Sequence, residues 1–325
     1  MVIDYLLPEF QKRGLDFNPR RVRYCMVSSN RGGDGNDLVF LFPGRQKSPR
    51  FVTKIGRTPS NAEALTNEFK WVRFLADRQK GLGLLPVMHF SGEWNGRGYF
   101  VQDTVDGVGF DVALLRWGAN SKTRSCIAQA VDFLADLQST FLQDDLRRRE
   151  DASRLFEAHL AAIDANPGQR ARIKESADAV GLASCFTHGD FWATNVLIDS
   201  KRTRINGVID FEFASDCCYS HFDIFWLVVN LPMFIGEPSF RGGLFPSYQH
   251  AFFDGKKVHM YREIFQKYFG KIGKKTPPLF DLFIVSLLHG SFRGKKILGY
   301  STHMDSVCSE MLRWSLDNEP AFNLR

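Results

Sequence analysis

Three side chains that together could transfer a phosphoryl group lie close in the sequence. Asp190 and Asn195 are five residues apart in the segment THGDFWATN, and Asp210 follows fifteen residues later, after the apolar run Gly207–Ile209. Phosphoryl transfer needs one carboxylate to receive the proton of the attacking hydroxyl. It also needs a second carboxylate and an amide oxygen to hold Mg²⁺ against the phosphates. Asp190 fits the first role, and Asn195 and Asp210 fit the second.

A simpler interpretation is that Asp190 caps a turn and that Asp210 ends a strand. His-Gly-Asp alone would favour this interpretation, because three residues recur by chance. The longer pattern is more specific, since the interval from Asp190 to Asn195 is that of a kinase catalytic loop and a second acid ends the following hairpin. The sequence therefore predicts a phosphoryl-transfer site.

The motifs His188-Gly189-Asp190 with Asn195, and Ile209-Asp210-Phe211-Glu212, resemble those of the aminoglycoside phosphotransferase/choline kinase family. The resemblance extends loosely from about Arg21 to about Asn230 and more weakly beyond. It implies a two-lobed kinase-like fold that binds ATP or GTP with Mg²⁺ between its lobes. It also implies that phosphate is delivered to a small-molecule hydroxyl.

Two further positions bear on the resemblance. Asp223 lies where the family often has an Asp that braces the catalytic loop, so we expect a structural role for it. Leu137-Gln138 departs from the Leu-His of many relatives. His188 is expected to bond backbone groups within the loop, because a carboxylate is better placed to act as the base.

The N-terminal half offers a test, because a kinase-like fold needs a strand Lys at the nucleotide phosphates and a helix Glu that holds it. Lys54 lies in the apolar strand pattern Phe51–Ile55, and Glu68 follows fourteen residues later in a predicted helix. Glu63 is the competing partner. A strand Lys usually faces solvent, but the downstream motif favours Lys54 and Glu68 as cofactor-binding residues. The glycine-rich loop Asn30–Asn36 would then lie over the phosphates.

The expected elements form a small β-rich half and a larger helical half. Turn signals and apolar alternation predict strands at Val22–Ser28, Leu38–Phe42, Phe51–Ile55 and Tyr99–Thr104, with a helix that begins near Pro59. From Ser121 the pattern is mostly helical, interrupted by short strands at Val196–Asp199 and Ile205–Ile209. We therefore expect an α+β, two-lobed fold of the protein-kinase kind, with a nucleotide-binding lobe at 1–104. A helical lobe with the catalytic loop and acceptor site would cover 105–325.

Composition excludes several other classes of protein. A hydrophobic fraction of 44% with 24% charged residues fits an ordinary soluble globular chain. Met1–Gly14 lacks the features of a secretory signal, and the apolar stretch Phe222–Gly236 is too short and too interrupted to span a membrane. We therefore expect a cytoplasmic protein. The six cysteines lack metal-ligand spacing, and the net charge of +6 includes no basic run with aromatics, so zinc and nucleic acid are not expected.

The acceptor is expected to be a small molecule. Only about a dozen residues separate Asp210 from the apolar helix near Phe222, too few for the activation segment of a protein kinase. Glu237–Tyr300 contains four acidic residues and eleven Lys or Arg. This balance favours a neutral or anionic acceptor, such as a sugar or a sugar phosphate, over a polycationic aminoglycoside or choline. Alternatively, these lysines only solvate surface helices.

A nucleotide-binding pseudokinase that acts as a scaffold is the alternative from another functional class. It is disfavoured because Lys54, Asp190, Asn195 and Asp210 are all present.

Overall fold

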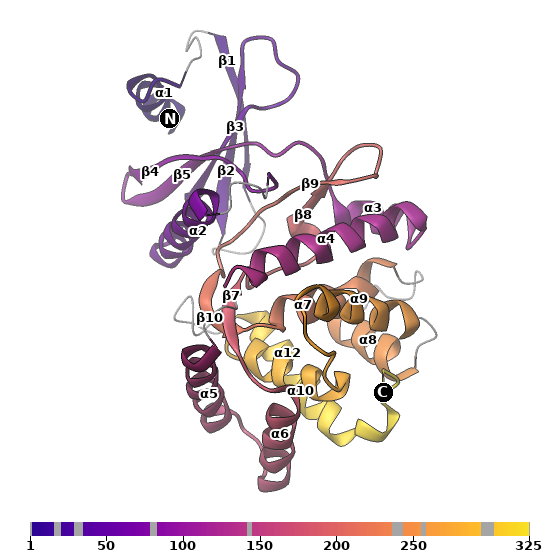
Figure 1. Ribbon diagram of the computed structural model, residues 1–325. Coiled ribbons are helices and arrows are strands. Elements are labelled where there is room, and N and C mark those ends of the chain that lie inside the picture. The colour runs from indigo at the N-terminus through magenta and orange to yellow at the C-terminus, as the bar shows by residue number, and fades with distance from the viewer. Residues whose placement is uncertain are drawn as a thin grey trace. The chain divides into compact units, whose positions relative to one another are not determined.

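The structure, a computed structural model, describes residues 2–15, 21–28, 35–78, 83–141, 145–235, 243–254, 258–293 and 302–324. The chain divides into two compact units, Met1–Val105 and Asp106–Arg325. The first unit contains a β-sheet and the second is mainly helical, which confirms the predicted α+β class (Figure 1). Of the predicted glycine-rich loop, only Gly35 and Asn36 belong to the described residues.

A five-stranded antiparallel sheet forms the centre of the first unit, with the strand order β1-β2-β3-β5-β4 (Figure 1). The strands are β1 (Val22–Ser28), β2 (Asn36–Pro43), β3 (Phe51–Gly56), β4 (Met88–Trp94) and β5 (Arg97–Asp103). The predicted strands correspond to β1, β2, β3 and β5, whereas β4 was not predicted. All six residues of β3 are buried, so both faces of this central strand are covered.

Two helices cover the sheet. Because side chains alternate along a strand, Phe51 and Ile55 of β3 lie on one face and Lys54 on the other. Helix α1 (Val2–Lys12) packs Leu6 and Phe10 into the apolar core that contains Phe51 and Ile55. Helix α2 (Pro59–Arg78) covers the Lys54 face through Glu68. Helix α1 was not predicted, although its buried residues recur at helical spacing, because Pro8 interrupts the pattern.

The second unit is a helical body with two small sheets. One sheet pairs β7 (Ser184–Thr187) with β10 (Ser215–Tyr219), and the other has the order β6-β8-β9, formed by Val108–Gly109, Val196–Ile198 and Ile205–Val208. The earlier helices are α3 (Phe110–Trp117), α4 (Ser121–Ser139), α5 (Asp145–Ala162) and α6 (Pro167–Val180). The later ones are α7 (Phe222–Ile235), α8 (Leu244–Gln249), α9 (Val258–Lys271), α10 (Leu279–Gly290) and α12 (His303–Asp317). Short helical turns are η2 (Ala193–Asn195), η4 (His250–Asp254) and η5 (Glu319–Ala321).

Helices α7 and α10 form the core of the second unit. Every residue of α10 is buried, and nearly every residue of α7 is buried. A helix that is buried on every side must be enclosed by other elements. Among the described residues, no helix combines the length and apolarity that crossing a membrane would require. Strands β7 and β10 and helix α3 are short and were not predicted.

Replacing Phe10 tests whether α1 belongs to the folded core of the first unit. Phe10 is fully buried, and its ring packs edge-on against the rings of Phe51 and Phe90 at centroid distances of 5.1 and 5.4 Å. Phe10→Ala should lower the free energy of unfolding by about 3–5 kcal/mol, because a buried aromatic side chain leaves a cavity. Urea unfolding measures this loss. The control Val87→Ala, at a 56% exposed position, should change little, and an equally small effect of Phe10→Ala would contradict the packing of α1.

Candidate active site

The loop between β7 and β8 brings Asp190 and Asn195 into direct contact. The amide Nδ2 of Asn195 donates to the backbone carbonyl of Asp190 at 2.9 Å and to its carboxylate Oδ2 at 3.0 Å. The turn η2 curls the chain between them, and both residues are more than nine-tenths buried. The five-residue interval thus corresponds to one compact, hydrogen-bonded loop.

Asp210 lies beside this loop because β8 and β9 pair. Val196 is opposite Val208, and the backbone N–H of Ile209 donates to the carbonyl of Asn195 at 3.0 Å. Asp210 therefore follows directly after the residue bonded to Asn195. Its φ angle is +71°, a left-handed conformation that costs free energy for a residue other than glycine. Strained backbone of this kind clusters at functional sites.

His188 and Gly189 fix the start of the loop. The His188 ring accepts the backbone N–H of Asp190 at Nδ1 (3.2 Å), and its Nε2 lies 3.0 Å from the carbonyl of Ile209. With Nδ1 as acceptor and Nε2 as donor, the ring links the two segments that carry Asp190 and Asp210. Gly189 has a φ of +77°, and a Cβ there would lie 2.2 Å from the Phe213 carbonyl oxygen, so only glycine fits.

Asp223 braces the loop from helix α7. Its carboxylate accepts the backbone N–H groups of His188 at 2.7 Å and Gly189 at 2.9 Å. Gln138 of α4 donates Nε2 to Asp223 Oδ2 at 3.4 Å and to the Phe186 carbonyl at 3.3 Å. The Gln138 side chain thus keeps α4 in contact with the start of the loop.

Two residues that the sequence reasoning missed complete the surroundings of Asp190. Trp226 of α7 donates Nε1 to Asp190 Oδ1 at 3.0 Å. Arg293, three residues after the end of α10, donates Nη1 to the same oxygen at 2.9 Å and to the carbonyl of Gly189 at 2.6 Å. Arg293 lies more than a hundred residues from the motif, and no periodicity or spacing distinguishes it from the neighbouring basic residues.

In the first unit, Lys54 and Glu68 form a buried ion pair. The Nζ atom of Lys54 lies 2.8 Å from both carboxylate oxygens of Glu68, whose side chain is fully buried. Glu63, the competing partner, is exposed on the same helix. Helix α2 therefore places Glu68 against the middle of β3. A buried Lys–Glu pair holds the ammonium group in one position.

The donor atoms at Asn195 and Asp210 fit Mg²⁺. Magnesium prefers oxygen ligands and keeps several waters, so it is held in proteins by one or two carboxylate or amide groups plus phosphate oxygens. The Nδ2 hydrogen bonds of Asn195 orient its amide. Its Oδ1 accepts from Thr194 Oγ1 at 3.4 Å and has a second lone pair, which could bind the metal. Across the described residues, no three His, Cys, Asp or Glu side chains cluster so that they could hold a metal ion.

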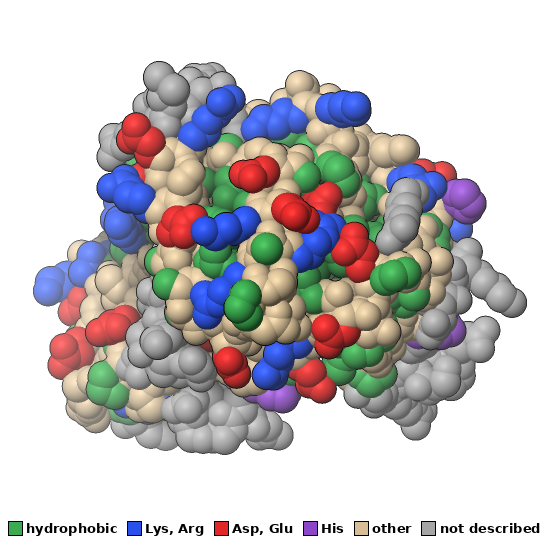
Figure 2. Space-filling model, turned by 90° about the horizontal axis from the view of Figure 1, so that it is seen from below, with side chains coloured by type: hydrophobic (Ala, Val, Ile, Leu, Met, Phe, Trp, Pro, Cys, Tyr) green, Lys and Arg blue, Asp and Glu red, His purple; other side chains and the backbone are tan. Residues whose placement is uncertain are grey.

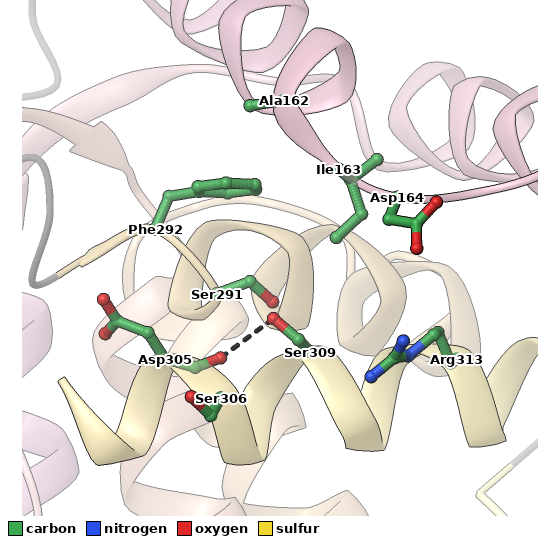
Figure 3. A pocket seen from close by; sticks show the side chains of 9 residues that line it. All are labelled: Ala162, Ile163, Asp164, Ser291, Phe292, Asp305, Ser306, Ser309 and Arg313. Atoms are coloured by element: carbon green, nitrogen blue, oxygen red, sulfur yellow. Dashed lines mark hydrogen bonds between the residues drawn. The ribbon is translucent and has the colours of Figure 1, made fainter. Parts of the chain in front are cut away.

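A separate cavity of about 240 Å³ lies among the end of α5, the end of α10 and α12 (Figure 3). Ser291, Phe292, Ser309 and Arg313 are among its lining residues, and none of the predicted site residues lines it. Ser309 Oγ is already bonded to the Asp305 carbonyl at 2.9 Å. The cavity therefore does not belong to the cluster around Asp190.

On the face drawn in Figure 2, basic and acidic side chains are interspersed, and neither sign of charge dominates. Lys267 pairs with Asp132 at 2.8 Å and Lys271 with Asp136 at 3.0 Å, so these cations connect α9 with α4. Lys256, Lys257, Lys295 and Lys296, which contributed to the predicted basic balance, lie outside the described residues.

Comparison with known proteins identifies one matching family model, described as the phosphotransferase enzyme family, over residues 28–261. No curated protein sequence matches the chain. Similar structures include a candidate aminoglycoside phosphotransferase from Ralstonia eutropha, with 14% identity, 97% and 95% of the two chains covered and a TM-score of 0.55. Another is an ethanolamine kinase from Plasmodium vivax, with 10% identity, 90% and 82% coverage and a TM-score of 0.48.

A third similar structure is an aminoglycoside phosphotransferase from Streptomyces rimosus in complex with ADP and streptomycin. It has 14% identity, 85% and 93% of the two chains are covered, and the TM-score is 0.48. At these identities the likeness concerns the fold alone, and the Ralstonia structure carries it. The predicted resemblance to this family is confirmed by the family model.

The pH dependence of stability tests the role of Asp223. Burial raises the pKa of its carboxyl from 3.8 to about 7, although the N–H donors of His188 and Gly189 and the nearby Arg293 act in the opposite direction. The folded state therefore retains a proton that the unfolded chain loses above about pH 4. Protonated Asp223 therefore contributes to the free energy of unfolding. The contribution is complete below about pH 4 and is lost as the pH rises through about 7.

Asp223→Asn should remove this loss, because an amide does not ionise. Between pH 4 and pH 8 the stability of the wild type should fall by about 2–4 kcal/mol relative to the variant. Urea unfolding of both proteins at intervals of pH measures the difference. Parallel pH profiles would contradict a raised pKa of Asp223.

Proposed function

Because the chain belongs to the phosphotransferase enzyme family, we propose that it transfers the γ-phosphate of ATP to a hydroxyl group of a neutral or anionic small molecule. The observation that carries this proposal is the cluster of Asp190, Asn195 and Asp210, joined by hydrogen bonds and strand pairing in the second unit. It provides one buried carboxylate for the proton and two oxygen ligands for a metal.

Asp190 acts as the base in this proposal. The acceptor hydroxyl loses its proton to the carboxylate as its oxygen attacks phosphorus, and a positioned carboxylate typically accelerates such a step by about 10²–10⁴-fold. The hydrogen bond from Asn195 connects the base to the proposed metal site, so the two functions share one rigid loop. Bound Mg²⁺ would neutralise the charge that develops on the phosphate oxygens.

Lys54 and Glu68 are the proposed contribution of the first unit to nucleotide binding. The buried carboxylate of Glu68 holds the Lys54 ammonium, and a fixed ammonium group is suited to contact phosphate oxygens. GTP remains the alternative donor, because the described residues include no contact that distinguishes the two bases.

The charge around Asp190 supports the proposed acceptor class. An unpaired carboxylate would attract a cationic acceptor, but Asp190 is already paired with the buried guanidinium of Arg293. This pair favours a neutral or anionic hydroxyl compound, such as a sugar or a sugar phosphate. The lysines of α9 add little to this argument, since Lys267 and Lys271 serve surface ion pairs. An aminoglycoside or choline-type acceptor is the alternative.

Substitution of Asp190 tests the proposed base. Asp190→Asn should lower Mg²⁺-dependent turnover of ATP over a panel of sugars and alcohols by about 10²–10⁴-fold, with nucleotide affinity retained. The exposed Asp216 of β10 provides a control, because Asp216→Asn removes a carboxylate that has no role in the proposed reaction. Unchanged turnover in Asp190→Asn would exclude Asp190 as the base. No turnover in the wild type with any acceptor or nucleotide would favour a pseudokinase.

Substitution of Asp210 tests the proposed metal ligand. Asp210→Ala should abolish the Mg²⁺-dependent part of nucleotide binding, because one of two protein ligands is removed. Calorimetric titration of ADP with Mg²⁺ and with EDTA separates the two contributions for wild type, Asp210→Ala and the control Asp216→Ala. If Asp210→Ala bound MgADP like the wild type, Asp210 would not be a metal ligand.

A further inference from the structure

Arg293 occupies an unusual position for an arginine. Its side chain is only 5% exposed, and its guanidinium lies between two aromatic rings, 4.4 Å from the centroid of Phe213 and 4.7 Å from that of Trp226. Phe213 follows Asp210 by three residues, and Trp226 belongs to α7. The guanidinium thus fills a slot between the two active-site segments and the helical core, where a desolvated cation interacts strongly with ring faces.

The hydrogen bonds of Arg293 converge on the catalytic loop. Its Nη1 donates both to the carbonyl of Gly189 and to the carboxylate Oδ1 of Asp190. Among the ion pairs of the described residues, Asp190 takes part only in this one. A buried carboxylate without a partner would be costly, and Arg293 provides the opposite charge beside it.

The donors around Asp190 distinguish its two carboxylate oxygens. Among the described residues, Oδ1 accepts from Arg293 and Trp226 at 2.9 and 3.0 Å, whereas Oδ2 accepts only from Asn195, at 3.0 Å. A carboxylate oxygen has two lone pairs in its plane. In the described structure Oδ1 is therefore saturated, and the one remaining acceptor position of the carboxylate is on Oδ2.

We propose that Arg293 is a positioning residue for phosphoryl transfer, which with Trp226 holds Asp190 so that Oδ2 receives the proton of the acceptor hydroxyl. This inference rests on the proposed function. In the step, the hydroxyl oxygen forms a bond to the γ-phosphorus, the bond from that phosphorus to the bridging oxygen of ATP breaks, and ADP leaves. The hydroxyl proton moves to Oδ2, while Oδ1 keeps its two N–H donors.

Truncation of Arg293 with chemical rescue tests the proposal. The probe is phosphate release from MgATP without an added acceptor, where water takes the place of the hydroxyl compound. Arg293→Ala should lower kcat about 100-fold, as expected for a misplaced catalytic group. The KM for MgATP should change less than about threefold, because Arg293 acts on the base. Guanidinium chloride at about 20 mM, far below denaturing concentrations, should restore much of the rate by filling the aromatic slot.

Arg172 offers a matched control in the same unit. It also forms ion pairs, with Glu319 and Asp281 at 2.8 Å, and its guanidinium lies 5.1 Å from the ring centroid of Phe280. Arg172→Ala should lower stability but leave kcat and its response to guanidinium unchanged. Sodium chloride at the same concentration controls for ionic strength in both variants.

The outcomes separate this inference from the proposed function. Suppose that Asp190→Asn hydrolyses MgATP more slowly than the wild type but Arg293→Ala hydrolyses it at the wild-type rate. The proposed role of Arg293 is then wrong, and the assignment of Asp190 as the base is retained. The proposed role of Arg293 would also be wrong if guanidinium did not restore the kcat that Arg293→Ala loses. The same holds if sodium chloride restored it equally well.

A double-mutant cycle keeps the pairing testable even if the wild type releases no phosphate. The unfolding equilibrium constants of Asp190→Asn, Arg293→Gln and the double variant should show a coupling of about tenfold or more. If the effects of the two substitutions on the unfolding equilibrium constant were independent, Asp190 and Arg293 would not be paired. This conclusion would hold whether or not the wild type releases phosphate.

Discussion

A buried negative charge organises the proposed catalytic site of the second unit. The Asp190 carboxylate is largely shielded from water, where an uncompensated charge would be unstable. In the described part of the chain, three side chains provide N–H donors to it: Asn195 from the same loop, Trp226 from α7 and Arg293 beyond the end of α10. Each comes from a different element, so the position of Asp190 depends on all of them being packed together. The rest of the site is arranged around this requirement.

Backbone geometry is held by a second buried carboxylate. Asp223 accepts the N–H groups of His188 and Gly189, which fixes the peptide groups directly before Asp190. Gln138 connects Asp223 with α4, and the hydroxyl of Tyr268 donates to the Gln138 side chain from α9. The loop is therefore joined by hydrogen bonds to three helices of the core. Such a network positions reactive groups on rigid elements, which limits the reorganisation needed during a reaction.

The contacts among Asp190, Asn195 and Asp210 could be predicted from the sequence because these residues lie close along the chain. Asp190 and Asn195 share one loop, and Asp210 is brought to them by a hairpin whose two strands follow each other along the chain. Lys54 and Glu68 were predictable for a similar reason, since a strand and the next helix pack together. The roles of Lys54 and Glu68 in nucleotide binding, and those of Asn195 and Asp210 in metal binding, stay predictions.

Contacts between distant segments could not be derived in this way. Arg293 reaches Asp190 only through the packing of α10 and α7, and a sequence shows such packing only as general apolarity. For the same reason, the number of basic residues in the C-terminal region did not reveal their separate contacts. Arg293 is buried beside Asp190, whereas Lys267 and Lys271 form surface ion pairs. Helix α1 was missed because Pro8 masks its apolar stripe.

The most direct test of the account is to follow radioactive phosphate from [γ-³²P]ATP in a small-molecule extract of cells. The wild-type protein with Mg²⁺ should transfer the label to a soluble phosphate ester, from which a phosphatase releases the labelled phosphate. That ester would identify the acceptor. Asp190→Asn should leave the label in ATP. Label that reaches only inorganic phosphate, or that becomes attached to protein, would contradict a phosphotransferase for a small-molecule hydroxyl.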